Sequence, residues 1–235
     1  MPAVTSDTTF HDLPEVRALL RMQQARITSE ASLRPHGHAL VLRARADARA
    51  NPVDTRHLLP VRQHVEGGGL SGDASCHPQA LCWHDAAFQL VVVQHAGEAL
   101  GACDGLLPEL ARVLAPGGIL LWFGLNPCSP WLARLRWTRP SGTVRAPQAV
   151  TAGAVRRRLL AEHLSAMRVE WLGPWWRDGG PADAGHRPAP GPLRAAYLLR
   201  AVRQQSAAIP LRVSPSRAAA ASAGPLAVPS RRACA

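Results

Sequence analysis

Two apolar runs near the middle of the chain predict a pair of strands that are buried on both faces of a sheet. Residues 88–95 read FQLVVVQH, and residues 118–127 read GILLWFGLNP. Continuous apolar runs of this length, rich in β-branched residues in the first case, are typical of central strands in a parallel sheet. Between them, residues 104–118 place leucine and valine along one helical stripe and end at Pro-Gly-Gly. This order predicts a strand–helix–strand unit, whose right-handed crossover makes the two strands parallel.

Weaker patterns before this unit predict the first part of the sheet. Residues 12–24 open with an acid and a proline and then follow a helical period, which predicts a helix. The sequence HALVL at 38–42 predicts a strand. The apolar run 55–62 contains Pro60, which cannot donate a backbone hydrogen bond, so we expect an edge or irregular strand there. Residues 66–79 are rich in glycine and predict a loop.

Patterns after the central unit complete the predicted order of elements. They indicate helices at 130–137 and 151–165, followed by strands at 167–176 and 193–202. Alternating strands and helices are typical of an α/β protein. We therefore predict a doubly wound, Rossmann-like, mostly parallel sheet with a late antiparallel hairpin.

The length and composition of the chain favour one domain with flanking segments. A chain of 235 residues suits a single α/β domain better than two full domains. We expect an N-terminal helical segment over 1–37, the α/β domain over 38–203 and a tail over 204–235. The tail is dominated by Ala, Ser, Pro and Arg without an apolar period, which predicts disorder.

The positive charge does not by itself indicate a nucleic-acid site. The formal net charge is +11 and every basic side chain is an arginine. Residues 200–235 carry many of these arginines and no acid, whereas those before them are scattered, apart from a triplet at 156–158. A solvated basic surface is the favoured interpretation. Nucleic-acid binding through the tail stays a weaker alternative, in which affinity would be electrostatic and steeply dependent on salt.

The cysteines and the apolar content indicate a protein of a reducing compartment. The cysteines are Cys76, Cys82, Cys103, Cys128 and Cys234. Their spacing fits neither a disulfide framework nor a zinc site, so we expect small buried thiols and no metal. The N-terminus has no apolar signal-peptide core, and no apolar run approaches the roughly 20 residues that span a bilayer. The sequence therefore predicts a cytoplasmic protein without a membrane segment.

Residues 86–131 contain a distinctive string, ELARVL at 109–114 followed by PGG at 116–118. With this string, the segment resembles the second half of class I S-adenosylmethionine-dependent methyltransferases of the methyltransferase type 11 group. The segment Leu-Asn-Pro-Cys-Ser at 125–129 stands where bacterial members have Phe-Asn-Pro-Trp-Ser. A looser similarity extends over about residues 10–203. The resemblance implies a methyltransferase that uses S-adenosylmethionine and acts on an unidentified acceptor.

The resemblance also implies a cofactor site at the carboxyl ends of the strands, where open α/β sheets bind ligands. The family's first strand is followed by an acid and glycines that admit the cofactor. Here that position holds Arg43, Ala44 and Arg45, and the Cβ atoms of these residues occupy space that glycines would leave open. The acid that ends the family's second strand has no clear equivalent. A methyltransferase-like scaffold without catalysis, acting as a binding or partner-regulating module, is therefore the alternative function.

Four further residues are candidates for cofactor binding. Asp73 and Ala74 fall near the family's acidic-Ala pair, although an Asp there can equally cap a loop turn. Gln94 and His95 end a buried strand, where side chains reach a ligand or are satisfied by neighbouring backbone. His95 also suggests a general base, with Glu98 as a companion. We predict no catalytic residue, because sulfonium is already an excellent leaving group and proximity alone carries much of the rate of methyl transfer.

Overall fold

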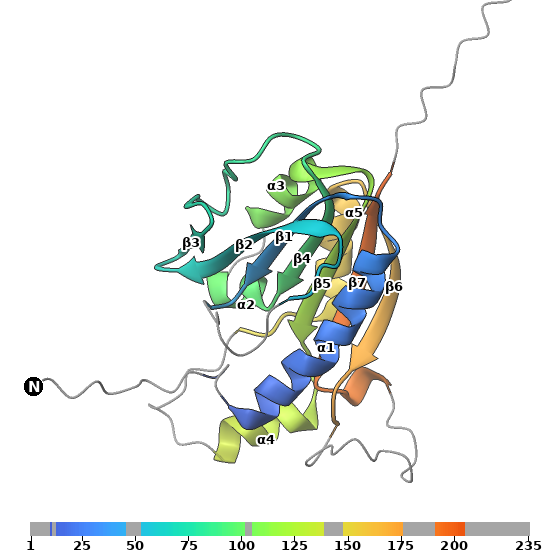
Figure 1. Ribbon diagram of the computed structural model, residues 1–235. Helices are drawn as coiled ribbons and strands as arrows, with labels where there is room; N and C mark the ends of the chain where they lie inside the picture. Colours follow the sequence, from blue (N-terminus) through green and yellow to red (C-terminus); the bar gives the residue numbers. More distant parts are fainter. Residues whose placement is uncertain are drawn as a thin grey trace, which may run out of the picture. The chain divides into compact units, whose positions relative to one another are not determined.

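The computed structural model describes residues 10, 13–45, 53–101, 105–138, 148–175 and 191–204. Its seven strands form one sheet in the order β3-β2-β1-β4-β5-β7-β6 (Figure 1). The strands are β1 (Gly37–Arg43), β2 (Leu58–Glu66), β3 (Gly69–Gly72), β4 (Phe88–Gln94), β5 (Leu114–Leu125), β6 (Leu164–Leu172) and β7 (Ala196–Arg203). The helices are α1 (Pro14–Ser32), α2 (Ala96–Leu100), α3 (Leu106–Val113), α4 (Pro130–Thr138) and α5 (Ala152–Ala161), and Gly191–Leu193 forms a short 3-10 turn.

The sheet has the mixed topology that the apolar pattern predicts. β1 pairs in parallel with β2 and β4, and β4 pairs in parallel with β5. β7 lies between β5 and β6 and is antiparallel to both. The predicted fold class is therefore confirmed, including the parallel central pair and the late antiparallel hairpin.

The first half of the sheet differs from the prediction at its edge. The glycine-rich segment that was expected to be a loop contains β3, which pairs antiparallel with residues 63–66 of β2. β2 is therefore an internal strand over this stretch. Pro60 lies before the stretch of β2 that pairs with β3. At Pro60, β1 is the strand that pairs with β2 among the described residues, so β2 is still an edge strand there. A proline, which has no backbone N–H to donate, is tolerated in an edge strand. The turn between the two strands uses Gly67 and Gly68, both at positive φ, as two-residue hairpins require.

The boundaries of three other elements also shift. α1 continues to Ser32, well beyond the predicted end of this helix at residue 24. β5 begins at Leu114 rather than at residue 118. α5 ends at Ala161, and Leu164, which the helix predicted at 151–165 included, starts β6. In each case packing against the sheet decides where the element begins or ends, because propensity is a weak guide at boundaries.

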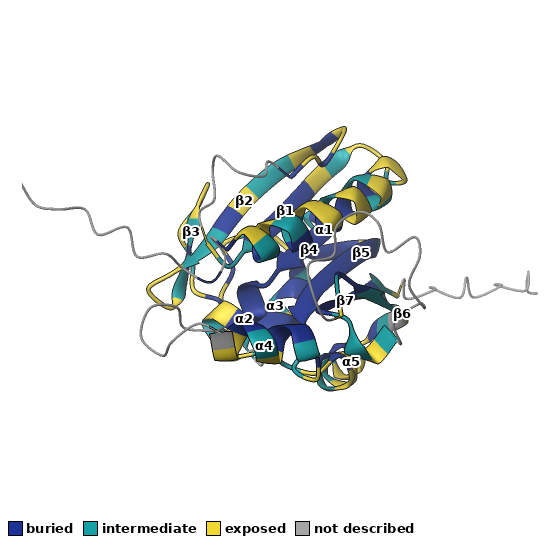
Figure 2. Ribbon diagram, turned by 90° about the horizontal axis from the view of Figure 1, so that it is seen from below, coloured by how far each residue is buried: buried dark blue, intermediate teal, exposed yellow. Residues whose placement is uncertain are grey.

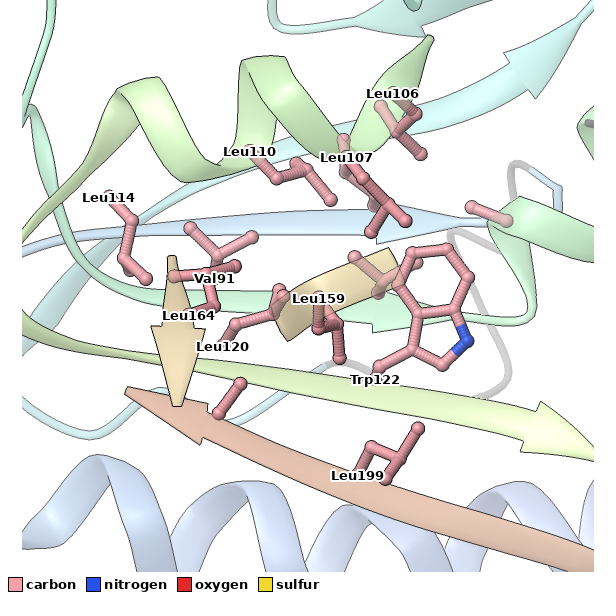
Figure 3. Close-up of a cluster of buried hydrophobic side chains, with 14 of the residues drawn as sticks. Val91, Leu106, Leu107, Leu110, Leu114, Leu120, Trp122, Leu159, Leu164 and Leu199 are labelled. Atoms are coloured by element: carbon pink, nitrogen blue, oxygen red, sulfur yellow. The ribbon is translucent and has the colours of Figure 1, made fainter. Parts of the chain in front are cut away.

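The two faces of the sheet are covered by different helices. Alternate residues of β1, β4 and β5 face opposite sides, as a strand period of two dictates. One side packs against Ile27 and Ala31 of α1, whereas the other packs against α3 and α5. Figure 3 shows Leu107 and Leu110 of α3 beside Val91 and Leu120 of the sheet. β4 and β5 are buried almost throughout, while most positions of β2 are intermediate or exposed (Figure 2).

α1 covers its face of the sheet although it precedes β1 in the chain. Glu30 pairs with Arg200 of β7, with Oε1 3.0 Å from Nε, and Arg26 pairs with Glu170 of β6. The connection between β1 and β2 spans residues 44–57, and its described part, 44–45 and 53–57, contains no helix. Among the described residues, this face is therefore covered by α1, which precedes the first strand, and not by a crossover helix between two parallel strands.

The segment between β3 and β4 is held against α3 by one arginine and one glutamate. Leu81 N donates to Glu109 Oε2 at 2.8 Å, and Arg112 donates to the carbonyl oxygens of Leu81 and Trp83 at 3.0 and 2.9 Å. The hydrogen bond from Arg112 lowers the pKa of Glu109, and the carboxylates of Glu109 and Asp85 raise the pKa of Arg112. These charged groups give an irregular segment a defined path.

We predict that Glu109→Gln lowers the free energy of unfolding by about 1–2 kcal/mol at pH 7, because a charge-assisted hydrogen bond is lost. Folding lowers the pKa of Glu109, so its contribution is present above the unfolded-state pKa and is lost as the pH falls through the folded-state pKa. Urea unfolding should therefore show the variant converging with the parent below about pH 4. The exposed control Glu66→Gln should show no such convergence, and a pH-independent deficit in Glu109→Gln would contradict the electrostatic origin.

Gly124 is required by a close approach between two strands. It pairs directly with Tyr197 of β7, and a Cβ at this position would overlap the tyrosine ring, whose hydroxyl donates to Val150 O at 2.8 Å. Because the ring is tethered at its far end, it cannot move aside easily.

We predict that Gly124→Ala destabilises the protein by about 1–3 kcal/mol through overpacking. Gly153 provides a matched control, because it lies in α5 and nothing lies within 4 Å of an added Cβ. Gly153→Ala should raise stability by up to about 1 kcal/mol, since alanine favours a helix. Thermal unfolding of the two variants measures both effects, and equal melting temperatures would show that the strand contact is not constrained.

Candidate functional site

The order of the strands reverses between β1 and β4. From β1 the chain continues to β2 on one side and returns to β4 on the other. In open α/β sheets, ligands bind at the carboxyl ends of strands where this reversal occurs. The carboxyl ends of β1 and β4 are therefore the place to look for a site.

The structure brings five of the candidate residues together at this edge. Arg43 and Gln94 are partners in the β1–β4 register, and Ala44 N donates to Gln94 O at 3.1 Å. His95 follows directly, and its backbone N donates to Phe123 O of β5 at 3.2 Å. Arg45 comes next after Ala44 and is exposed. Asp47, which lies two residues beyond Arg45, is outside the described residues.

The structure places the other two candidates elsewhere. Asp73 N donates to Arg62 O at 2.9 Å, and its carboxylate Oδ2 accepts from Arg62 N at 2.8 Å. The carbonyl oxygen of Ala74 accepts from Gln63 Nε2 at 3.0 Å. Both residues are thus bonded to β2, and β1 separates that strand from β4. The side chain of Asp73 therefore bonds across to the backbone of the neighbouring strand β2.

A buried polar network lies behind the β4 edge. His95 starts α2 in the left-handed conformation, with φ 59°, and is only 1% exposed. Its Nδ1 lies 2.9 Å from Glu98 Oε2, and its Nε2 lies 3.0 Å from Gln23 Nε2 of α1. Gln94 Nε2 donates to Gln23 Oε1 at 2.9 Å. These directions are consistent with a histidine that carries its proton on Nδ1, donates to Glu98 and accepts from Gln23.

Glu98 extends the network to β5. Its second carboxylate oxygen, Oε1, accepts from the backbone N of Leu125, at the carboxyl end of that strand. The side chain of Glu98 is only 3% exposed. One carboxylate therefore joins the ends of β4 and β5 and the start of α2, and through His95 it reaches α1.

The sequence contains a signal for Gln23 that prediction did not use. The buried positions of α1 are Val16, Leu19, Gln23, Ile27 and Ala31, which follow a helical spacing. A glutamine on such a stripe must find partners inside the protein, because burying an unbonded amide is costly. Gln23 already lies inside the helix predicted at 12–24, and the extension to Ser32 adds Ile27 and Ala31 to the same buried stripe. The position is therefore a candidate for a polar contact at the sheet.

The end of β5 is also bound within the protein. Asn126 Nδ2 donates to the carbonyl oxygens of Pro192 and Arg194 at 2.6 and 2.9 Å. Its Oδ1 accepts from Cys128 N at 3.1 Å. Asn126 therefore fastens the turn after β5 to the segment that enters β7.

The described part of the chain contains no group of three or more Asp, Glu, His or Cys side chains that could hold a metal ion. Within those same residues, no helix is both long and apolar enough to cross a membrane.

We predict that Glu98→Ala lowers the free energy of unfolding by about 3 kcal/mol, because Leu125 N–H and the imidazole of His95 lose their buried acceptor. Glu66 is the control, since its side chain is 69% exposed and lies 3.7 Å from His64. Glu66→Ala should change stability by no more than about 0.5 kcal/mol. Chemical denaturation measures both variants, and similar values would show that the Glu98 network adds little to the fold.

Comparisons by sequence find no match, either among protein-family models or among curated proteins.

Comparisons of the structure find similar folds among solved proteins. One is a methyltransferase dependent on S-adenosylmethionine from Thermotoga maritima, described as a possible histamine N-methyltransferase, with TM-score 0.51 and 11% identity over 80% of this chain and 92% of that chain. Another is phosphoethanolamine N-methyltransferase 2 of Haemonchus contortus, solved with phosphomonomethylethanolamine and S-adenosylhomocysteine. It has TM-score 0.51 and 10% identity, covering 83% of this chain and 59% of that chain. The fold of this chain is therefore that of the S-adenosylmethionine-dependent methyltransferases.

Proposed function

We propose that this chain is a methyltransferase that binds S-adenosylmethionine at the edge formed by β1 and β4 and transfers its methyl group to an acceptor. The observation that carries the proposal is the pairing of Arg43 with Gln94 at the strand-order reversal, with Ala44 and His95 next to them. This is the edge where a doubly wound sheet binds a ligand. The fold and the similarity of residues 86–131 to type 11 methyltransferases support the same function.

The residues at this edge fit the cofactor only in part. No glycine occurs between Gly37 and Gly67, so the turn after β1 offers no bare backbone to a ligand. The groups of the buried network already bind one another, so a ligand that used them would have to displace these hydrogen bonds. The positive charges of Arg43 and Arg45 oppose a sulfonium, unless the carboxylate of the cofactor pairs with a guanidinium. We infer weak binding.

The chain's contribution to the reaction is positioning. When bound, S-adenosylmethionine supplies a methyl group on a sulfonium that is already an excellent leaving group. The protein therefore has to hold cofactor and acceptor in line and exclude water, and a general base is not essential. His95 is buried and hydrogen-bonded to Gln23 and Glu98, so we assign it to holding the edge rather than to taking a proton.

We predict that the full chain binds S-adenosylmethionine weakly in calorimetry and that Arg43→Gly/Arg45→Gly tightens binding by about tenfold or more. Removing two side chains from the turn relieves overlap and repulsion, and about 1.4 kcal/mol corresponds to a factor of ten. A matched control is Arg156→Ala/Arg157→Ala, which removes the same charge from exposed positions of α5 and should leave the affinity unchanged.

The possible outcomes distinguish three interpretations. Tighter binding by the glycine variant alone supports a cofactor site that the arginines narrow. Tight binding by the parent that weakens in the glycine variant would identify the arginines as ligands and contradict the steric argument. Absence of binding by both, in proteins shown to be folded, would contradict the methyltransferase proposal and favour the scaffold alternative.

A further inference from the structure

Two thiols lie in contact beside the edge of the sheet. Cys76 Sγ and Cys82 Sγ are 3.2 Å apart, and both residues are free cysteines. A disulfide has an S–S distance of about 2.05 Å, so a shift of roughly 1 Å would bring the two atoms to bonding distance. The expectation that the cysteines are buried is wrong for the described ones, because Cys82 and Cys128 are exposed and Cys76 is partly exposed.

The backbone on each side of the pair is held independently. Cys76 forms two hydrogen bonds with Leu70 of β3, each 2.9 Å long, as an isolated antiparallel bridge. On the other side, Leu81 and Trp83 flank Cys82 and are bonded to Glu109 and Arg112 of α3. The two thiols are therefore close because the backbone segments that carry them are each held by hydrogen bonds.

The two sulfurs are chemically unequal. Gln63 Nε2 donates a hydrogen bond to Cys76 Sγ at 2.9 Å. Burial, and the hydrogen bond with Cys76, raise the pKa of Cys82. Cys76 Sγ thus accepts a hydrogen bond from Gln63, while Cys82 is the more exposed of the two thiols.

From this geometry we infer that Cys76 and Cys82 form a reversible dithiol–disulfide site, oxidised by a low-molecular-weight disulfide such as oxidised glutathione. The Cys76 thiolate attacks one sulfur of the oxidant, and a mixed disulfide forms as one thiolate leaves. The Cys82 thiolate then attacks Cys76 Sγ, and the second thiolate leaves. The two protons of the cysteines pass to the two leaving thiolates, so the protein loses two hydrogens and the oxidant is reduced to two thiols.

The link would join β3 to the segment that α3 holds. Asp73 and Ala74 lie between β3 and Cys76, on the β2 side of the sheet. In the oxidised form the chain from Cys76 to Cys82 becomes a small covalent ring between these two anchors. The oxidised site would therefore stiffen the edge hairpin of the domain.

The test uses the full wild-type chain under native conditions. The protein is incubated with oxidised glutathione, the remaining thiols are alkylated, and chymotrypsin cleaves after Leu81, between the two cysteines. We expect a chymotryptic pair of peptides joined through Cys76 and Cys82, with neither of these two cysteines carrying glutathione. Dithiothreitol should separate the peptides and restore both thiols.

Single substitutions provide the controls. Cys76→Ser and Cys82→Ser should each leave one thiol that gains a glutathione instead of a protein link. Cys128→Ser removes a cysteine that the structure places outside the pair and should leave the link unchanged. A wild-type protein in which Cys76 or Cys82 carries glutathione without a link, or is joined to Cys103, would overturn the inference. The wild-type peptide map decides this even if a serine variant fails to fold.

Discussion

The arrangement at the carboxyl ends of β4 and β5 depends on the hydrogen bonds that the carboxylate of Glu98 accepts. It accepts hydrogen bonds from the backbone of Leu125 and from His95, and His95 in turn contacts Gln23 of α1. A buried carboxylate is stable only when such partners are present, because its desolvation is costly. The ends of two strands and two helices are therefore fixed by one acidic side chain, and Arg43 and Gln94 take their places beside that fixed point.

The sequence predicted best those parts of the fold that a single apolar signal determines. β4 and β5 are continuous apolar runs joined by an amphipathic helix, and their parallel pairing follows from the crossover rule. β3 was missed because it is four residues long, glycine-containing and at an edge. The two glycines before it are nonetheless a hairpin signal, since both adopt positive φ in the structure.

From the sequence, only those parts of the candidate site that lie at the ends of predicted strands could be predicted. Arg43 and Gln94 meet because the carboxyl ends of neighbouring parallel strands share an edge. Asp73 does not join them, because β3 runs antiparallel to β2 and carries the residue to the outer side of that strand. Gln23 and the pair Cys76–Cys82 depend on tertiary contacts between distant segments, which no local pattern specifies.

The position of α1 has a consequence for how the chain is made. The contact between Glu30 and Arg200 joins residues separated by 170 positions, so α1, the first helix of the described residues, packs on β7, the last strand of those residues. Until β7 leaves the ribosome, the apolar stripe of α1 lacks part of its partner surface. Contacts of such long sequence separation slow folding and prolong the exposure of apolar surface. During synthesis, this early helix therefore keeps part of its apolar stripe open to solvent and to chaperones.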